Sequence, residues 1–130
     1  MRGAVLAWAV AALAWQGPAV APDVAATWAR VVPLVSAITL NDHENGEVLG
    51  TLADQIERVE REEATPGALR LRVTLAPGGA DRLRRSECTR DAAAAPLEGF
   101  GAPFVCGEAR RVVVRVADDR MQALIDVPTP

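Results

Sequence analysis

An uncharged apolar segment at the amino terminus decides how much of this 130-residue chain is left to fold into a domain. Arg2 is followed by no further charge until Asp23, and residues 4–15 are apolar throughout. A basic start, a short apolar run and a helix-breaking end are typical of a secretory signal peptide. Twenty uncharged residues also match the length that spans a bilayer. We therefore expect residues 1–26 to be a signal peptide or an uncleaved membrane anchor, with membrane contact through residues 3–22.

Both alternatives place residues 27–130 outside the cytoplasm. We expect the protein to be exported, in the periplasm or extracellular, either soluble or anchored in the inner membrane by its N-terminal segment. The two cysteines agree with an oxidising compartment. Cys88 and Cys106 enclose a loop that contains two prolines, and neither a C-x-x-C spacing nor a metal-ligand set surrounds them. The sequence therefore predicts a structural Cys88–Cys106 disulfide.

The remaining residues predict an α+β fold. Residues 69–75 alternate apolar and polar side chains, as a half-buried strand does. Further strands are expected at 111–117 and at about 35–40, since Pro33 interrupts the apolar run at 31–40. A short helix that holds Trp28 is an optional element before the strand at 35–40. Residues 121–127 alternate as another strand, with a helix from Asp118 as the alternative. A short helix is expected within 80–90, and residues 92–103 read as a loop.

The predicted helix at 47–63 is the main one. Leu52, Ile56 and Val59 recur at helical spacing, and Asn45 suits its N-cap. We expect this amphipathic helix to pack on a small, mostly antiparallel sheet of about three or four strands. One disulfide closes the domain, and the apolar N-terminal segment precedes it.

Composition excludes some classes of function. A net charge of −3 argues against nucleic acid as a partner. The chain has one histidine, no glycine-rich phosphate loop and no nucleophile motif. We therefore expect a non-enzymatic protein without a cofactor or a resident metal. The alternative is a small hydrolase or metal-dependent enzyme centred on the turn at 42–47, where Asp42, His43, Glu44 and Glu47 could ligate a cation if their side chains converge.

The arginines suggest a binding surface. Residues 66–120 carry ten arginines against seven acids, whereas residues 27–65 carry three arginines against eight acids. Arg70 and Arg72 alternate with apolar residues, so they share the outward face of one strand, and we predict them to be the binding residues. Other arginines are expected near that face: Arg82, Arg84, Arg85, Arg110, Arg111 and Arg115.

These features predict a non-enzymatic cell-envelope protein that binds another protein, one with an acidic surface. It would be soluble in the periplasm or tethered as an accessory subunit of a membrane complex. The second alternative is a protein that binds anionic lipids or glycans through an arginine-lined face of its sheet.

Overall fold

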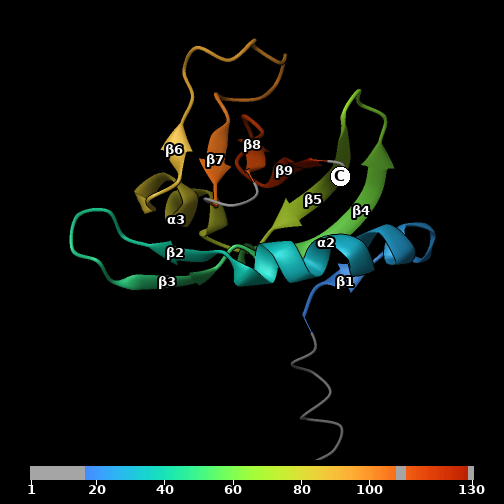
Figure 1. The fold of residues 1–130 in the computed structure, drawn as a ribbon, viewed down its shortest axis with the longest axis horizontal. Helices are drawn as coiled ribbons and strands as arrows, with labels where there is room; N and C mark the ends of the chain where they lie inside the picture. Colours follow the sequence, from blue (N-terminus) through green and yellow to red (C-terminus); the bar gives the residue numbers. More distant parts are fainter. Residues whose placement is uncertain (1–16, 108–110, 129–130) are drawn as a thin grey trace, which may run out of the picture.

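The computed structural model describes residues 17–107 and 111–128, which form a mostly-sheet fold (Figure 1). Most of the predicted leader and Arg110 lie outside the described residues. The main sheet has seven strands in the order β1-β4-β5-β9-β8-β7-β6. Its strands are β1 (Ala19–Val20), β4 (Ile56–Glu63), β5 (Ala68–Leu75), β6 (Thr89–Arg90), β7 (Phe104–Cys106), β8 (Val112–Val116) and β9 (Gln122–Pro128). The predicted small sheet of three or four strands is therefore wrong.

The sheet is mixed because its first pair is parallel. β1 runs parallel to β4, and every other neighbouring pair is antiparallel. A separate two-stranded sheet joins β2 (Thr39–Asn41) to β3 (Val48–Thr51). The isolated bridge between Asp42 and Ser86 ties this hairpin to the segment that leads into β6.

The long helix lies near the amino terminus. A 3-10 turn, η1 (Pro22–Val24), leads directly into α2 (Ala25–Ala37). Val24, Trp28, Val31 and Val35 recur at intervals of three and four residues, and all are buried in the core. Burial of this stripe explains why α2 continues through Pro33, whose side chain is exposed. The predicted break at Pro33 and the predicted strand at 35–40 are therefore wrong: residues 35–37 belong to α2, and β2 begins at Thr39.

No helix forms at 47–63. This segment contains β3, the 3-10 turn η2 (Ala53–Gln55) and β4. Leu52, Ile56 and Val59 are buried, as predicted, but η2 and the bulged strand β4 produce their spacing. The β4–β5 register shifts between Ile56 and Arg58, and such a bulge places residues three apart on the same face.

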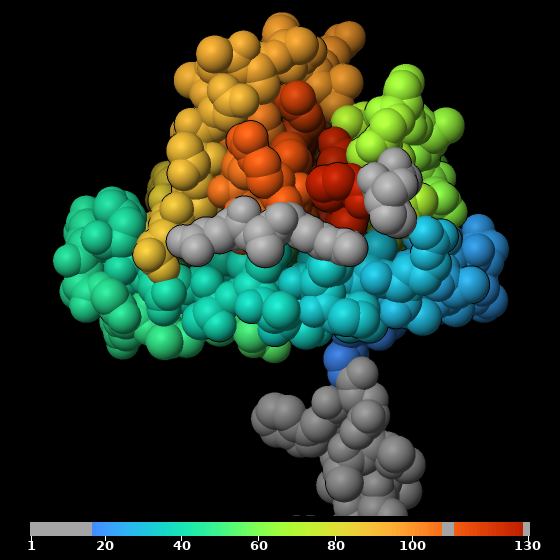
Figure 2. All heavy atoms as spheres, viewed as in Figure 1, coloured from blue at the N-terminus to red at the C-terminus, as the bar shows by residue number. Residues whose placement is uncertain are grey.

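The two faces of the main sheet differ in what covers them. The inner face packs against α2 around Val59, Leu71, Val73, Val114 and Ile125. The outer face carries the alternate residues of β5 and β9, including Arg70, Arg72 and Asp126. Loop residues 91–103 project at the end of the molecule opposite α2 (Figure 2), and Phe100 of that loop stacks near Arg72 on the outer face.

The remaining helix, α3 (Gly79–Arg85), matches the short helix predicted within 80–90. Its buried Leu83 is the apolar contact that the sequence indicated. Gly78 precedes it with φ of 78°, a conformation that favours glycine. The strands predicted at 69–75, 111–117 and 121–127 correspond to β5, β8 and β9, so the helical alternative after Asp118 is wrong.

Candidate functional site: an arginine-lined pocket

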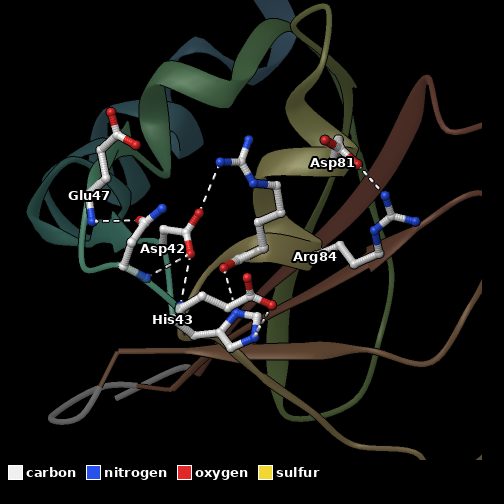
Figure 3. Close-up of polar contacts among 8 residues, drawn as sticks. Asp42, His43, Glu47, Asp81 and Arg84 are labelled. Atoms are coloured by element: carbon white, nitrogen blue, oxygen red, sulfur yellow. Dashed lines mark hydrogen bonds and ion pairs between the residues drawn. The ribbon is translucent and has the colours of Figure 1, made fainter.

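The turn at 42–47 is held together by Asp42, which is 6% exposed. One carboxylate oxygen accepts the backbone N–H groups of Glu44 at 2.9 Å and Asn45 at 3.4 Å. The other accepts Arg85 Nη2 at 2.9 Å (Figure 3). The Glu44 backbone donor and then the Arg85 guanidinium hold the pKa of Asp42 below its usual value. Asp42 thereby connects the turn at 42–47 to Arg85, the last residue of α3.

The cation-binding side chains predicted in this turn point in different directions. His43 Nδ1 lies 2.8 Å from the backbone oxygen of Arg85, and the carboxylate of Glu47 points away from Asp42 (Figure 3). Within residues 17–107 and 111–128, no cluster of three or more His, Cys, Asp or Glu side chains is placed to hold a metal ion. The convergence that would favour a metal-dependent site at 42–47 is absent from this turn.

Arg70 and Arg72 share the outer face of β5, as their alternation predicted. Each is engaged in an ion pair, and their side chains are 19% and 22% exposed. Arg70 donates to both carboxylate oxygens of Asp126, at 2.6 and 2.8 Å, and this raises the pKa of the guanidinium. Arg72 Nε lies 2.5 Å from Glu63, and this lowers the pKa of that carboxyl. Partner binding by this pair stays a prediction, and a partner would have to compete with Asp126 and Glu63.

The predicted disulfide is confirmed. Cys88 and Cys106 are bonded, with their Cα atoms 4.6 Å apart. The bond ties the segment before β6 to the end of β7, at the edge of the main sheet.

The other predicted arginines do not form one continuous group. Arg82 donates to Gln55 and to the backbone of Pro77, and Arg85 pairs with Asp42. Arg111 and Arg115 form no ion pair within the described part of the chain. Arg84 instead belongs to a second arrangement that includes two residues the sequence analysis did not select.

That arrangement surrounds a pocket of about 210 Å³. Three arginines line it from separate segments: Arg84 from the last turn of α3, Arg90 from β6 and Arg120 from the turn between β8 and β9. The rest of the lining is uncharged and consists of Ala80, Gly101, Ala102, Phe104 and Val116. The lining therefore combines three cationic residues with small and apolar ones.

The charges around this pocket are not balanced. Asp81 pairs with Arg84 (Figure 3) and lies 4.0 Å from Arg120 Nη2. Arg90 forms no ion pair within the described residues, and its guanidinium carbon lies 5.8 Å from the centroid of the Phe104 ring. Within the described residues, the three arginines therefore have one ion-pair carboxylate among them, that of Asp81. An anion that enters the pocket meets an excess of positive charge, as anion-recognition sites require.

Local sequence explains how each arginine reaches the pocket. Arg90 pairs with Phe104 across the β6–β7 ladder, so both side chains project from the same face of the sheet. Arg120 has φ of 62°, a left-handed conformation that glycine usually occupies. The turn holds it there through hydrogen bonds from Arg120 N–H to the Ala117 carbonyl and from Met121 N–H to Asp119. This backbone positions the Arg120 side chain beside Asp81.

A larger hollow of about 400 Å³ lies between the end of α2, β2 and β6, but its described lining has one charged residue, Glu87. The arginine-lined pocket is smaller than this hollow, but three of its lining residues are charged. Arg90 and Arg120 carried no signal in the sequence, because the two lie about 30 residues apart and no motif connects them.

The comparisons with known proteins do not identify the site. No family model, no curated protein and no solved structure matches the chain. Within the described residues, no helix has the length and apolarity needed to cross a membrane.

Proposed function

We propose that the protein is a non-enzymatic binding module of the cell envelope that recognises an acidic group on another protein. One observation carries the proposal: three arginines from three separate segments line one pocket, and within the described residues one carboxylate, that of Asp81, pairs with any of them. Arginine presents a planar, permanently charged donor group that matches a carboxylate.

The location in the envelope is part of this proposal. The Cys88–Cys106 bond supports an oxidising compartment, since structural disulfides persist there. The apolar N-terminal segment supports export, and the protein would act in the periplasm or as a tethered accessory subunit of a membrane complex. Arg70 and Arg72 are secondary contacts in this scheme, because internal carboxylates already neutralise them.

A labelled peptide tests the proposal. The probe is fluorescein-labelled hexaglutamate with an amidated carboxyl terminus, and binding is followed by fluorescence anisotropy at 0.15 M salt. The pocket variant Arg90→Gln/Arg120→Gln should bind at least about tenfold more weakly, since two charge-assisted contacts are lost. The control Arg30→Gln/Arg58→Gln removes the same charge from exposed arginines that form no ion pair in the described structure, and it should bind within about twofold of the unmodified protein.

Equal weakening in both variants would mean that net charge alone drives binding, and the proposal would fail. Phosphatidylglycerol vesicles and heparin serve as competing probes. If either binds through Arg90 and Arg120 while hexaglutamate does not, the ligand is a lipid or a glycan rather than a protein.

A further inference from the structure

The arginine-lined pocket is too small for a large ligand. Its volume of about 210 Å³ lies below the roughly 300–1,000 Å³ of typical small-molecule sites. It is open to solvent, because the side chains of Arg84 and Arg120 are 58% and 56% exposed. A pocket of this size at the surface suits one residue at the end of a chain.

The lining also restricts the chemistry of that residue. The lining joins three arginines to Phe104, Val116 and small residues. The guanidinium carbon of Arg90 lies 5.8 Å from the centroid of the Phe104 ring, so positive charge and apolar surface are adjacent. Phe104 is 8% exposed, so most of its side chain is buried in the core and only a small part of it is accessible. A ligand that satisfies both regions must carry a negative charge and an apolar group close together.

A carboxyl-terminal residue with an apolar side chain meets this requirement. Its carboxylate and its side chain leave the same Cα atom, so one can reach the arginines while the other contacts Phe104 and Val116. An internal Asp or Glu carries its charge at the tip of the side chain and has no apolar group beyond it. Phosphate and sulfate groups are polar on every side.

We infer that the pocket binds the free carboxyl terminus of a partner protein whose last residue is apolar. This inference rests on the proposed function and specifies the acidic group. Arg84, Arg90 and Arg120 would hold the terminal carboxylate, and Phe104 with Val116 would contact the last side chain.

Gly101 offers a way to block the pocket without changing its charge. A Cβ atom at Gly101 would lie 3.8 Å from the Val116 carbonyl oxygen and 4.0 Å from Arg90 Nη2, which are ordinary contacts. The backbone at Gly101 is not in the left-handed region, so it accepts a side chain without strain. Gly101→Val should fill part of the pocket and leave the fold intact.

The experiment uses the full chain and isothermal titration calorimetry with two short peptides. Acetyl-Ser-Gly-Ser-Leu is prepared with a free carboxyl terminus and with an amide. The free acid should bind at least about tenfold more tightly than the amide, which lacks the charge. Gly101→Val and, separately, Arg90→Gln should each weaken binding of the free acid by at least about tenfold, with the thermal midpoint of each variant measured as a check on folding.

Amidated hexaglutamate separates the two possible failures. If it binds at the pocket while the acid and the amide of the leucine peptide bind equally or not at all, the inference is wrong and the proposed function stands. If hexaglutamate also fails to bind, both are wrong. Retention of free-acid binding by folded Gly101→Val and Arg90→Gln variants would also overturn the inference, because the ligand would then lie elsewhere.

Discussion

At the residue scale, the buried carboxylate of Asp42 contributes to the stability of the fold through several contacts at once. It accepts two backbone N–H groups within its own turn and a guanidinium from α3. All three donors favour its ionised form, so its pKa lies below the ordinary value of 3.8. A group whose pKa is lowered by folding stabilises the native state above its unfolded pKa and loses that contribution as the pH falls.

We therefore expect the free energy of unfolding to be nearly constant from pH 7 to about pH 5 and to fall below about pH 4. Glu63 adds to this fall, because its pKa is lowered by Arg72. In Asp42→Asn, the free energy of unfolding should fall less at acid pH, since the amide keeps an acceptor for the turn but loses the ion pair with Arg85. Urea unfolding of both proteins at several pH values measures this. An identical pH dependence in the variant would show that Asp42 does not contribute.

At the scale of elements, alternation predicted the strands that lie deepest in the sheet. β5 and β9 pair along seven positions, and both show a regular period of two residues in the sequence. The sequence also indicated correctly that Leu52, Ile56 and Val59 are buried. It assigned them to a helix because a β-bulge and a 3-10 turn mimic the helical period, and these features depend on the partner strand β5 rather than on local preference.

The first elements of the fold lie before residue 27. β1 pairs with β4, Ala21 N–H donates to the Val59 carbonyl at 3.0 Å, and Val24 is 2% exposed in the core. Cleavage after Ala26 would remove all of these contacts. Cleavage before Pro18 would retain them.

A pair of truncated chains tests this dependence. A chain that starts at Thr27 should be less stable than one that starts at Pro18 by about 2–4 kcal/mol, because it loses the burial of Val24 and a strand pair. Thermal denaturation of the two proteins under the same conditions measures the difference. Midpoints within about 2 °C of one another would show that β1 and Val24 do not support the fold.

At the scale of the whole molecule, residues near in sequence were easier to relate than residues brought together by the fold. The Cys88–Cys106 bond was predictable because the chain has one cysteine pair, which encloses a loop that contains two prolines. The outward position of Arg70 and Arg72 followed from alternation, but their partners Asp126 and Glu63 come from neighbouring strands of the sheet. The arginine-lined pocket depends on how α3, β6 and the turn between β8 and β9 are placed relative to one another, which a single sequence does not specify.

The disulfide should contribute measurably to stability. It closes a loop with a sequence separation of 18 residues, and a crosslink of this size stabilises by about 3 kcal/mol in the chain-entropy model. Urea unfolding should therefore show Cys88→Ser/Cys106→Ser to be about 2–4 kcal/mol less stable than the oxidised protein. A loss below about 0.5 kcal/mol would mean that the loop is ordered without the bond.

The central claim is that the arginine-lined pocket, and not the paired arginines of β5, is the main recognition surface. Nuclear magnetic resonance of ¹⁵N-labelled protein, titrated with amidated hexaglutamate and separately with the free acid of acetyl-Ser-Gly-Ser-Leu, locates the contact directly. We expect the largest amide shifts at Arg84, Arg90, residues 101–104 and Arg120, with little change along α2. Shifts centred on Arg70 and Arg72, or spread evenly over the surface, would contradict this account.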